Sequence, residues 1–401
     1  MESIELFTGG GGLALGTHRA GFKHQALMEW NGDACDTLRR NVERSRGGAI
    51  TSMPGIDHWR VHQADIRRMI DDNFFGQFEG GTIDLVAGGV PCQPFSLGGK
   101  HRAHADTRDM FPDFVEVVRQ VRPRAFIVEN VKGLLRETFS SYFQYILLRL
   151  SYPDVSAKPD EDWRDHLHRL EEPSVGARRL DLLQYNVIFE LLNAADYGVP
   201  QARERVFIVG FRADLGIDWH FPKATHSREV LAYEQFISGE YWARHDAKLP
   251  RDHSPWCSEG LLKQLRHGDR PAGEAWRTVR DALVGLPEPR ERDSRVHHNH
   301  ILREGARAYP GHTGSPFDQP AKTLKAGVHG VPGGENMMVM PDGSLRYFSV
   351  REAARIQTFP DDWVFEGAWS EAMRQLGNAV PMKLAEVVAS SVHENLASAT
   401  R

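Results

Sequence analysis

Short apolar runs alternate with amphipathic segments along the first half of the chain, and this alternation restricts the possible folds more than any other feature. The runs of strand length lie at residues 3–7, 25–28, 61–64, 82–87, 125–128, 185–192 and 206–211. The segments with helical spacing between the earlier runs lie at residues 13–21, 33–41 and 110–121. Repeated strand–helix alternation predicts an α/β fold with a doubly wound, mostly parallel sheet.

The second half of the chain departs from this pattern. Residues 212–348 show little periodicity and many Gly, Pro, His and Trp residues, which is typical of irregular loops and short strands. We therefore expect a smaller, irregular, β-rich domain there, after a first domain at residues 1–211. Helical spacing returns at residues 350–357 and 382–392. Residues 349–401 are therefore expected to rejoin the first domain.

The composition is that of a globular, water-soluble chain. Lys and Arg number 49 against 54 Asp and Glu, and the net charge of −5 argues mildly against a nucleic-acid partner. No apolar run approaches the roughly 18 residues that cross a bilayer. The first three residues also lack the basic and apolar character of a signal peptide. We expect a cytoplasmic protein.

The three cysteines, Cys35, Cys92 and Cys257, are widely spaced and form no Cys-x-x-Cys pair. This spacing argues against a disulfide framework and against a cysteine-based zinc site. One of the thiols could instead take part in chemistry.

Cys92 is the candidate, because it lies in a loop of Gly, Pro, Gln and Ser residues directly after a strand-length run. Ligands of open α/β sheets bind at such strand ends. A buried structural cysteine is the alternative, but it more often lies within an apolar run. Glu129 follows the next predicted strand, so this thiol and this carboxylate can converge on one substrate.

Four consecutive glycines, Gly9 to Gly12, follow the first predicted strand. Backbone there can approach a nucleotide cofactor closely, although a tight turn without a ligand is the alternative. Glu29 ends the second strand, where a carboxylate can accept both hydroxyls of a ribose, and Trp30 could stack on an adenine. The alternatives, a surface carboxylate at Glu29 and a core position for Trp30, are equally open. Asp65 suits the end of the third strand or the N-cap of a helix.

Eight strings, in this order along the chain, resemble the motifs of the DNA (cytosine-5) methyltransferases of bacterial restriction-modification systems. They occupy residues 6–12, 29–30, 65–66, 91–96, 129–131, 197–205, 351–357 and 375–381. They include Pro91-Cys92-Gln93-Pro94-Phe95-Ser96, Glu129-Asn130-Val131 and, within residues 197–205, Gln201-Ala202-Arg203-Glu204-Arg205, and the match is specific because all eight occur in the family's order. The resemblance spans nearly the whole chain, and it implies a Rossmann-like methyltransferase domain with a target-recognition domain at residues 212–348.

The resemblance also implies a reaction, in which a methyl group passes from S-adenosylmethionine to carbon 5 of a cytosine flipped out of double-stranded DNA. Cys92 would add to carbon 6, because covalent addition makes carbon 5 nucleophilic. Glu129 would protonate or hydrogen-bond ring nitrogen 3, and Arg203 would contact the base carbonyl and orient the ring. Arg205 is expected to be a supporting charge at the substrate. For both arginines, a surface ion pair with Glu204 or a phosphate contact is the alternative.

The site residues that the resemblance assigns come from many parts of the chain. Those for the cofactor are Phe7, Gly9, Gly10, Gly12, Glu29, Trp30, Asp65, Ile66, Pro91, Asn378 and Val380. Those for the substrate, besides the catalytic residues, are Gln93, Ser96, Asn130 and Arg205. No metal is implied. The histidines His297, His298 and His300 are expected to be loop residues that read base edges rather than metal ligands.

Two stretches depart from the family pattern. Residues 106–111 are one residue shorter than the commonest form and have Met110 where leucine is usual, which weakens the assignment of Met110 to the cofactor. Residues 152–179 form an insertion, which we expect to be a solvated surface excursion. Residues 320–325 resemble a string near the end of the recognition domain and support the position of that domain.

Two other functions stay open at this point. An RNA (tRNA) cytosine-5 methyltransferase would share the catalytic loop, but the length of residues 212–348 favours DNA, because that branch of the family has a reduced recognition domain. A catalytically inactive DNA-binding homologue would be expected to have lost Cys92, Glu129 or Arg203, and all three are present. The expected partner is double-stranded DNA, bound by a monomer that is nucleoid-associated when it acts. A cognate restriction endonuclease is implied only by the common genomic setting.

Overall fold

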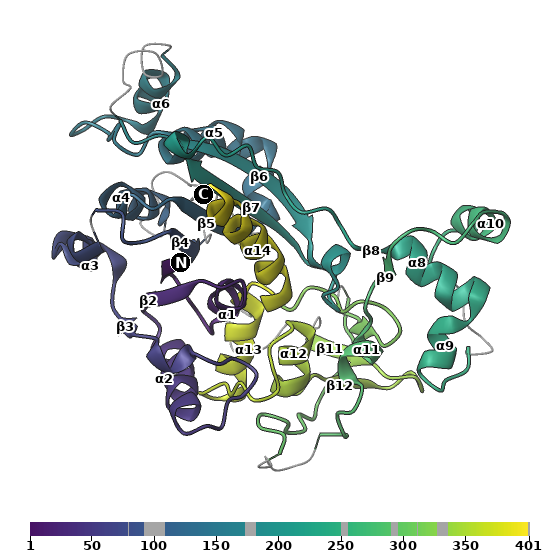
Figure 1. The fold of residues 1–401 in the computed structure, drawn as a ribbon. Helices are drawn as coiled ribbons and strands as arrows, with labels where there is room; N and C mark the ends of the chain where they lie inside the picture. The colour runs from purple at the N-terminus through teal and green to yellow at the C-terminus, as the bar shows by residue number, and fades with distance from the viewer. Residues whose placement is uncertain are drawn as a thin grey trace.

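The largest element of the fold is a seven-stranded β-sheet (Figure 1). The computed structural model describes residues 1–78, 80–91, 109–172, 182–249, 256–289, 296–310, 312–326 and 336–399. The strands are β1 (Glu2–Leu6), β2 (Lys23–Glu29), β3 (Val61–Gln63), β4 (Leu85–Gly89), β5 (Ala125–Val131), β6 (Tyr185–Asn193) and β7 (Glu204–Arg212). Their order is β3-β2-β1-β4-β5-β7-β6; the first five are parallel, and β7 is antiparallel to β5 and β6. The predicted doubly wound, mostly parallel sheet is confirmed.

Helices cover both faces of this sheet. They are α1 (Gly12–Arg19), α2 (Gly32–Arg46), α3 (Ile66–Asp71), α4 (Phe111–Val121), α5 (Ser140–Ser151), α6 (Trp163–Glu171), α12 (Val350–Ile356), α13 (Trp369–Asn378) and α14 (Met382–Ser398). On one face, α3 to α6 pack with Val86 and Val128 of the sheet. On the other face, α1 and α14 pack with Leu85 and Ile127. Because both faces of β4 and β5 are covered, these strands appear in the sequence as continuous apolar runs.

The insertion at residues 152–179 is less exposed than the sequence indicates. Its helix α6 buries Leu167 and Leu170 in the same core as the sheet. His166, also on α6, is fully buried, and its Nδ1 lies 2.9 Å from the hydroxyl of Tyr145. The expectation of a solvated excursion is therefore wrong for α6. The three-residue spacing of the two leucines was the signal that the composition concealed.

The C-terminal helix α14 lies against α1, beside the loop that follows β1 (Figure 1). Gly16 of α1 faces α14 so closely that a Cβ there would lie 2.4 Å from the Cβ of Ala385. Only glycine permits this approach. The packing explains how a segment some 370 residues further along the chain reaches the first glycine loop. None of the helices that the structure describes is long and apolar enough to cross a membrane.

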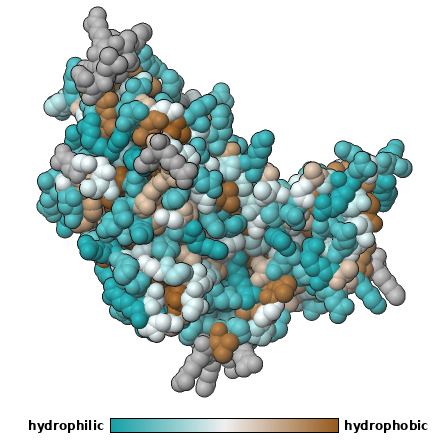
Figure 2. Space-filling view, viewed as in Figure 1, coloured by the Kyte–Doolittle hydropathy of each residue, from teal (hydrophilic) through white to brown (hydrophobic). Residues whose placement is uncertain are grey.

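Short elements make up the described part of residues 212–348. They are β8 (His226–Ser227), α8 (Arg228–Tyr233), α9 (Glu240–Arg244), α10 (Glu259–His267), β9 (Glu274–Ala275), α11 (Val279–Leu283), β10 (Ser315–Pro316), β11 (Met337–Val339) and β12 (Leu345–Tyr347). Strands β10, β11 and β12 form a small sheet. The helices were not predicted, because segments this short show no reliable period. In the space-filling view, the surface is hollowed between the part that carries α6 and the part that carries α8 to α10 (Figure 2).

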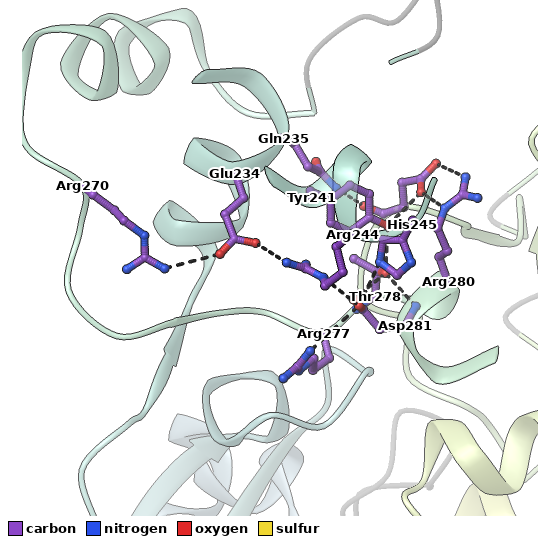
Figure 3. A network of polar contacts seen from close by, with 11 residues as sticks. Glu234, Gln235, Tyr241, Arg244, His245, Arg270, Arg277, Thr278, Arg280 and Asp281 are labelled. Atoms are coloured by element: carbon purple, nitrogen blue, oxygen red, sulfur yellow. Dashed lines mark hydrogen bonds and ion pairs between the residues drawn. The ribbon is translucent and has the colours of Figure 1, made fainter. Parts of the chain in front are cut away.

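A polar network ties α8 and α9 to α11 (Figure 3). Glu234, just after α8, pairs with Arg244 at 2.9 Å and with Arg270 at 3.3 Å. Asp281 of α11 pairs with His245 at 3.0 Å. The carboxylates are largely buried, so the network joins these helices through charged hydrogen bonds as well as apolar contacts.

Candidate active site

The strand order of the sheet reverses between the neighbouring parallel strands β1 and β4. In open α/β sheets, ligands bind at the carboxyl ends of the strands beside such a point. Here β1 leads into the glycine loop and β4 leads to Pro91, while Glu129 and Asn130 lie at the carboxyl end of β5, which pairs with β4. The predicted cofactor loop and the predicted catalytic carboxylate therefore lie at one edge of the sheet.

The glycine loop combines open and closely packed positions. A Cβ at Gly9 would meet no atom within 4 Å, and its φ of 57° is left-handed. A Cβ at Gly12 would lie 2.2 Å from the carbonyl oxygen of Val380, and one at Gly10 would lie 3.2 Å from Oε1 of Gln375. The structure thus brings Val380 beside the loop. Packing requires glycine at position 12, whereas Gly9 leaves space for a ligand.

Glu29, at the end of β2, holds the glycine loop in place. Its Oε2 accepts a hydrogen bond from the Gly9 amide at 2.7 Å, and its Oε1 accepts from the amides of Trp30 at 2.9 Å and Asn31 at 2.7 Å. The Trp30 side chain is 74% exposed, so the alternative of a core tryptophan is wrong. An exposed indole beside an anchored carboxylate offers an apolar face and acceptor oxygens to a nucleoside.

Asp65 is the N-cap of α3, where its Oδ1 accepts from the amide of Arg67 at 3.0 Å. The N-cap alternative is therefore confirmed, and a cofactor contact by the same carboxylate stays a prediction. Ile66 follows and is 4% exposed. Met110, partly buried, packs against the same core. Asp65 and Ile66 follow the carboxyl end of β3, and Met110 directly precedes α4.

Three other predicted cofactor residues are described. Phe7 has a left-handed backbone with φ of 57°, a strained conformation for a non-glycine residue and one that is concentrated at functional sites. Pro91 follows β4 at the same edge of the sheet. Asn378 is exposed at the end of α13. Their predicted roles toward the cofactor are not tested by these contacts.

The loop that is predicted to carry the nucleophile lies mostly outside the described residues. Cys92, Gln93 and Ser96 belong to the part of the chain that the structure does not describe. The start of the loop is fixed by Asn130, whose Nδ2 donates to the carbonyl oxygen of Val90 at 3.3 Å. Asn130 is 2% exposed, and its hydrogen bond joins the carboxyl end of β5 to the residue that follows β4.

Glu129 and Arg205 form a buried ion pair at this edge. The Nε of Arg205 lies 2.8 Å from Oε1 of Glu129, and their side chains are 12% and 8% exposed, respectively. Burial raises the pKa of the Glu129 carboxyl above its usual value, and the positive charges of Arg205 and Arg203 oppose the rise. A carboxyl group that can hold a proton thus lies beside a fixed guanidinium.

Arg203 has a different environment. Its side chain is fully buried, with Nη1 donating to the carbonyl oxygen of Leu324 at 2.9 Å and Nη2 donating to those of Gly377 at 2.7 Å and Ala379 at 3.0 Å. One guanidinium therefore joins three segments that are far apart in the sequence. The contact with Glu129 belongs to Arg205, which the sequence interpretation treated only as a supporting charge.

Gln201 and Gln357 are further residues of the site region that the sequence interpretation left without a role. Both are fully buried, and Nε2 of Gln201 donates to Oε1 of Gln357 at 3.1 Å. Oε1 of Gln201 accepts from the amide of Leu324 at 2.9 Å. Their presence in the strings at residues 197–205 and 351–357 was the available signal. They join Leu324 and the residue that follows α12 to the segment that leads into β7.

The fold and the site together define a doubly wound α/β protein with a glycine loop at the switch point of its sheet and a carboxylate–arginine pair at the same edge. The chain belongs to the C-5 cytosine-specific DNA methylases, because the model of that family matches residues 1–153 and 168–394. It is thus a DNA (cytosine-5) methyltransferase, as the resemblance implied.

Curated relatives agree with this assignment over almost the whole chain. The type II methyltransferase M.Eco47II of Escherichia coli is 31% identical over 400 residues, which cover 97% of this chain and 78% of the relative. M.PspPI of a Psychrobacter species is 30% identical and covers 99% of this chain and 80% of its own length. M.NgoMIV of Neisseria gonorrhoeae is 28% identical, with coverage of 98% and 97%.

Solved structures confirm the fold. A protein described as a DNA modification methyltransferase encoded within an E. coli prophage aligns with a TM-score of 0.57 and 20% identity, over 99% of both chains. The S. pombe Dnmt2 methyltransferase aligns with a TM-score of 0.54 and 17% identity, also over 99% of both chains. At these identities the likeness concerns the fold alone.

Proposed function

We propose that this enzyme methylates carbon 5 of a flipped-out cytosine in double-stranded DNA, with S-adenosylmethionine as methyl donor and Cys92 as covalent nucleophile. The observation that carries the proposal is the buried pair of Glu129 and Arg205 at the carboxyl end of β5. The pair lies beside the start of the nucleophile loop, because Asn130 binds the carbonyl oxygen of Val90. A carboxyl group and a guanidinium in this position can hold the polar edge of a pyrimidine while a thiol attacks its ring.

The chemistry requires the base to be activated before methyl transfer. The Cys92 thiolate adds to carbon 6, and the electron pair of the 5,6 double bond becomes available at carbon 5. Carbon 5 takes the methyl group, which the cofactor supplies as an electrophile, leaving S-adenosylhomocysteine. Loss of the proton from carbon 5 and departure of the thiolate then restore the double bond.

Glu129 serves ring nitrogen 3, where addition of the thiolate places electron density. To donate there near neutral pH, its carboxyl must hold a proton, and burial raises its pKa in that direction. Arg205 contacts this carboxylate. In this proposal, Arg205 also binds the carbonyl group of the base and orients the ring. Arg203 supports this arrangement by holding the neighbouring segments, and a base contact by Arg203 stays a prediction.

The residues at the ends of β1 and β2 fit S-adenosylmethionine. Gly9 leaves open space where the backbone can approach the methionine and ribose portions. Glu29 presents a carboxylate for the ribose hydroxyls, and Trp30 an exposed aromatic face for the adenine. Asp65 and Ile66 complete the adenine side in this proposal.

The recognition of DNA is assigned to residues 212–348, whose short elements and loops can reach base edges. In this proposal the enzyme protects a short DNA sequence from a cognate restriction endonuclease and acts in the cytoplasm as a monomer. Because the overall charge is negative, DNA binding must depend on a local cationic surface, and salt should weaken it steeply.

Bisulfite sequencing tests the proposal in a bacterial host that has no cytosine methylation of its own. Expression of the chain should place 5-methylcytosine at one short sequence throughout the genome, and expression of Cys92→Ala should not. An unmethylated genome together with methylation of transfer RNA by the purified protein would support the RNA alternative. DNA binding without methylation of either nucleic acid would support an inactive homologue.

A further inference from the structure

Arg67 connects two segments that flank the predicted adenine site. It is the second residue of α3, directly after Ile66, and its amide donates to the Asp65 carboxylate at 3.0 Å. Its guanidinium points away from its own helix: Nη2 donates to the carbonyl oxygen of Asp109 at 3.1 Å, and Nε lies 3.1 Å from Oδ2 of Asp113. One side chain thus joins the start of α3 to the start of α4.

The segment that receives Arg67 is itself well anchored. Asp109 is 7% exposed; its Oδ1 accepts from the amide of Phe111 at 3.1 Å, and its Oδ2 accepts from the hydroxyl of Tyr142 on α5. Met110 lies between these anchored residues. Its side chain packs against the core that also contains Ile66. The relative position of Ile66 and Met110 therefore depends on how α3 and α4 are held together.

We propose that Arg67 is a positioning residue for the cofactor, because it holds the start of α3, and with it Ile66, in a fixed position against the start of α4 beside the proposed adenine site. The inference depends on the proposed function, because that proposal places the adenine beside Asp65 and Ile66. A flat ring gains most from walls that are already at the right separation, since no free energy is then spent on ordering them. Apolar packing alone lets α3 and α4 slide, whereas a charged bridge with two acceptors sets their register.

Arg68 supplies a matched control. It is the next residue of α3, it is exposed, and it carries the same side chain. Calorimetric titration of the full chain with S-adenosylhomocysteine should give a dissociation constant roughly tenfold higher for Arg67→Gln, as the loss of one charged bridge implies. Arg68→Gln should bind like the wild type. The dissociation constant of adenosine alone should rise by the same factor in Arg67→Gln, because Arg67 is proposed to act on the adenine part of the site.

Kinetic measurements separate positioning from a general structural role. In Arg67→Gln, the KM for S-adenosylmethionine should rise, while turnover at saturating cofactor and the KM for DNA stay at wild-type values. Asp113→Asn should reproduce the effect, and Arg67→Lys should restore part of the affinity. If Arg67→Gln does not fold, the Lys and Asn variants carry the same test.

Two results would overturn the inference. One is unchanged affinity for S-adenosylhomocysteine in Arg67→Gln and Asp113→Asn. The other is a loss for S-adenosylhomocysteine without a loss for adenosine, which would place the effect away from the adenine. Failure of the wild-type protein to bind S-adenosylhomocysteine would instead contradict the proposed function, so the two failures are distinguishable.

Discussion

Arg205 on β7 and Glu129 on β5 lie diagonally across an antiparallel strand pair, with Nε of the arginine 2.8 Å from Oε1 of the carboxylate. Arg205 stands opposite Val131 in the register, so the Glu129 and Arg205 side chains share one face of the sheet. Groups on paired strands are held more rigidly than groups on loops. The acid of the proposed reaction is therefore fixed in place before DNA arrives.

The first prediction concerns Glu129. Glu129→Gln keeps the size of the side chain but cannot supply a carboxylic proton, so the single-turnover rate of methyl transfer should fall roughly 100-fold or more. The dissociation constant of S-adenosylhomocysteine, measured by calorimetry, should stay near the wild-type value. Equal losses of rate and cofactor affinity would move Glu129 to a structural role.

The two arginines should separate by what they affect. Arg203→Leu leaves three carbonyl oxygens without their donor, so the free energy of unfolding should fall by about 3 kcal/mol or more. Arg205→Leu should lower stability less, because the Glu129 carboxyl can take up a proton, but it should strongly reduce methyl transfer. Urea denaturation and a methylation assay on both variants decide the matter. The reverse pattern would return the base contact to Arg203.

The glycine loop predicts unequal effects of adding a methyl group. At Gly12 the new Cβ would lie 2.2 Å from the carbonyl oxygen of Val380, so Gly12→Ala should lower the free energy of unfolding by roughly 2–4 kcal/mol. Gly9→Ala meets no neighbour and should cost only the left-handed conformation, roughly 1–2 kcal/mol. Gly48→Ala, also left-handed and open, is the control for that conformational cost. Equal destabilisation at positions 9 and 12 would contradict the packing described here.

Glu5, buried in β1, predicts a pH effect on stability. Burial raises the pKa of its carboxyl well above the usual value, so the folded protein holds this proton more tightly than the unfolded chain. Stability from this group is full below the unfolded pKa of about 4 and is lost as pH rises toward the folded value. The side chain in Glu5→Gln cannot ionise. The melting temperature of this variant minus that of the wild type should therefore increase from pH 4 to pH 8. A difference that does not change with pH would argue against an ionising Glu5.

Local patterns were enough to predict the sheet, since burial on two faces imposes the apolar runs that became β4 and β5. Roles that depend on register were harder to predict. Arg203 and Arg205 are two residues apart and chemically identical, and only the pairing of β7 with β5 decides which one contacts Glu129. The burial of His166 likewise depends on α6 packing against α5, a tertiary contact that a charged, proline-rich segment conceals.

The glycine run shows the same limit at a smaller scale. The sequence presents four equivalent residues, yet Gly12 is required by a carbonyl oxygen that belongs to Val380, near the other end of the chain. Helical spacing predicted only that the C-terminal segment rejoins the first domain. The resemblance to a family, which assigns Gly12 and Val380 to the same cofactor, predicted that this segment meets the glycine loop. The physical reason for each glycine became visible only with the packing of the C-terminal segment.

The covalent mechanism is tested most directly by trapping the enzyme on DNA. A duplex with 5-fluorocytosine at the methylated position cannot lose a proton from carbon 5, so the Cys92 adduct should persist in the presence of S-adenosylmethionine. Mass spectrometry after denaturation should find protein plus oligonucleotide plus one methyl group, joined at Cys92, and should find none with Cys92→Ala. A wild-type enzyme that methylates the ordinary duplex and binds the fluorinated one without forming an adduct would contradict the account.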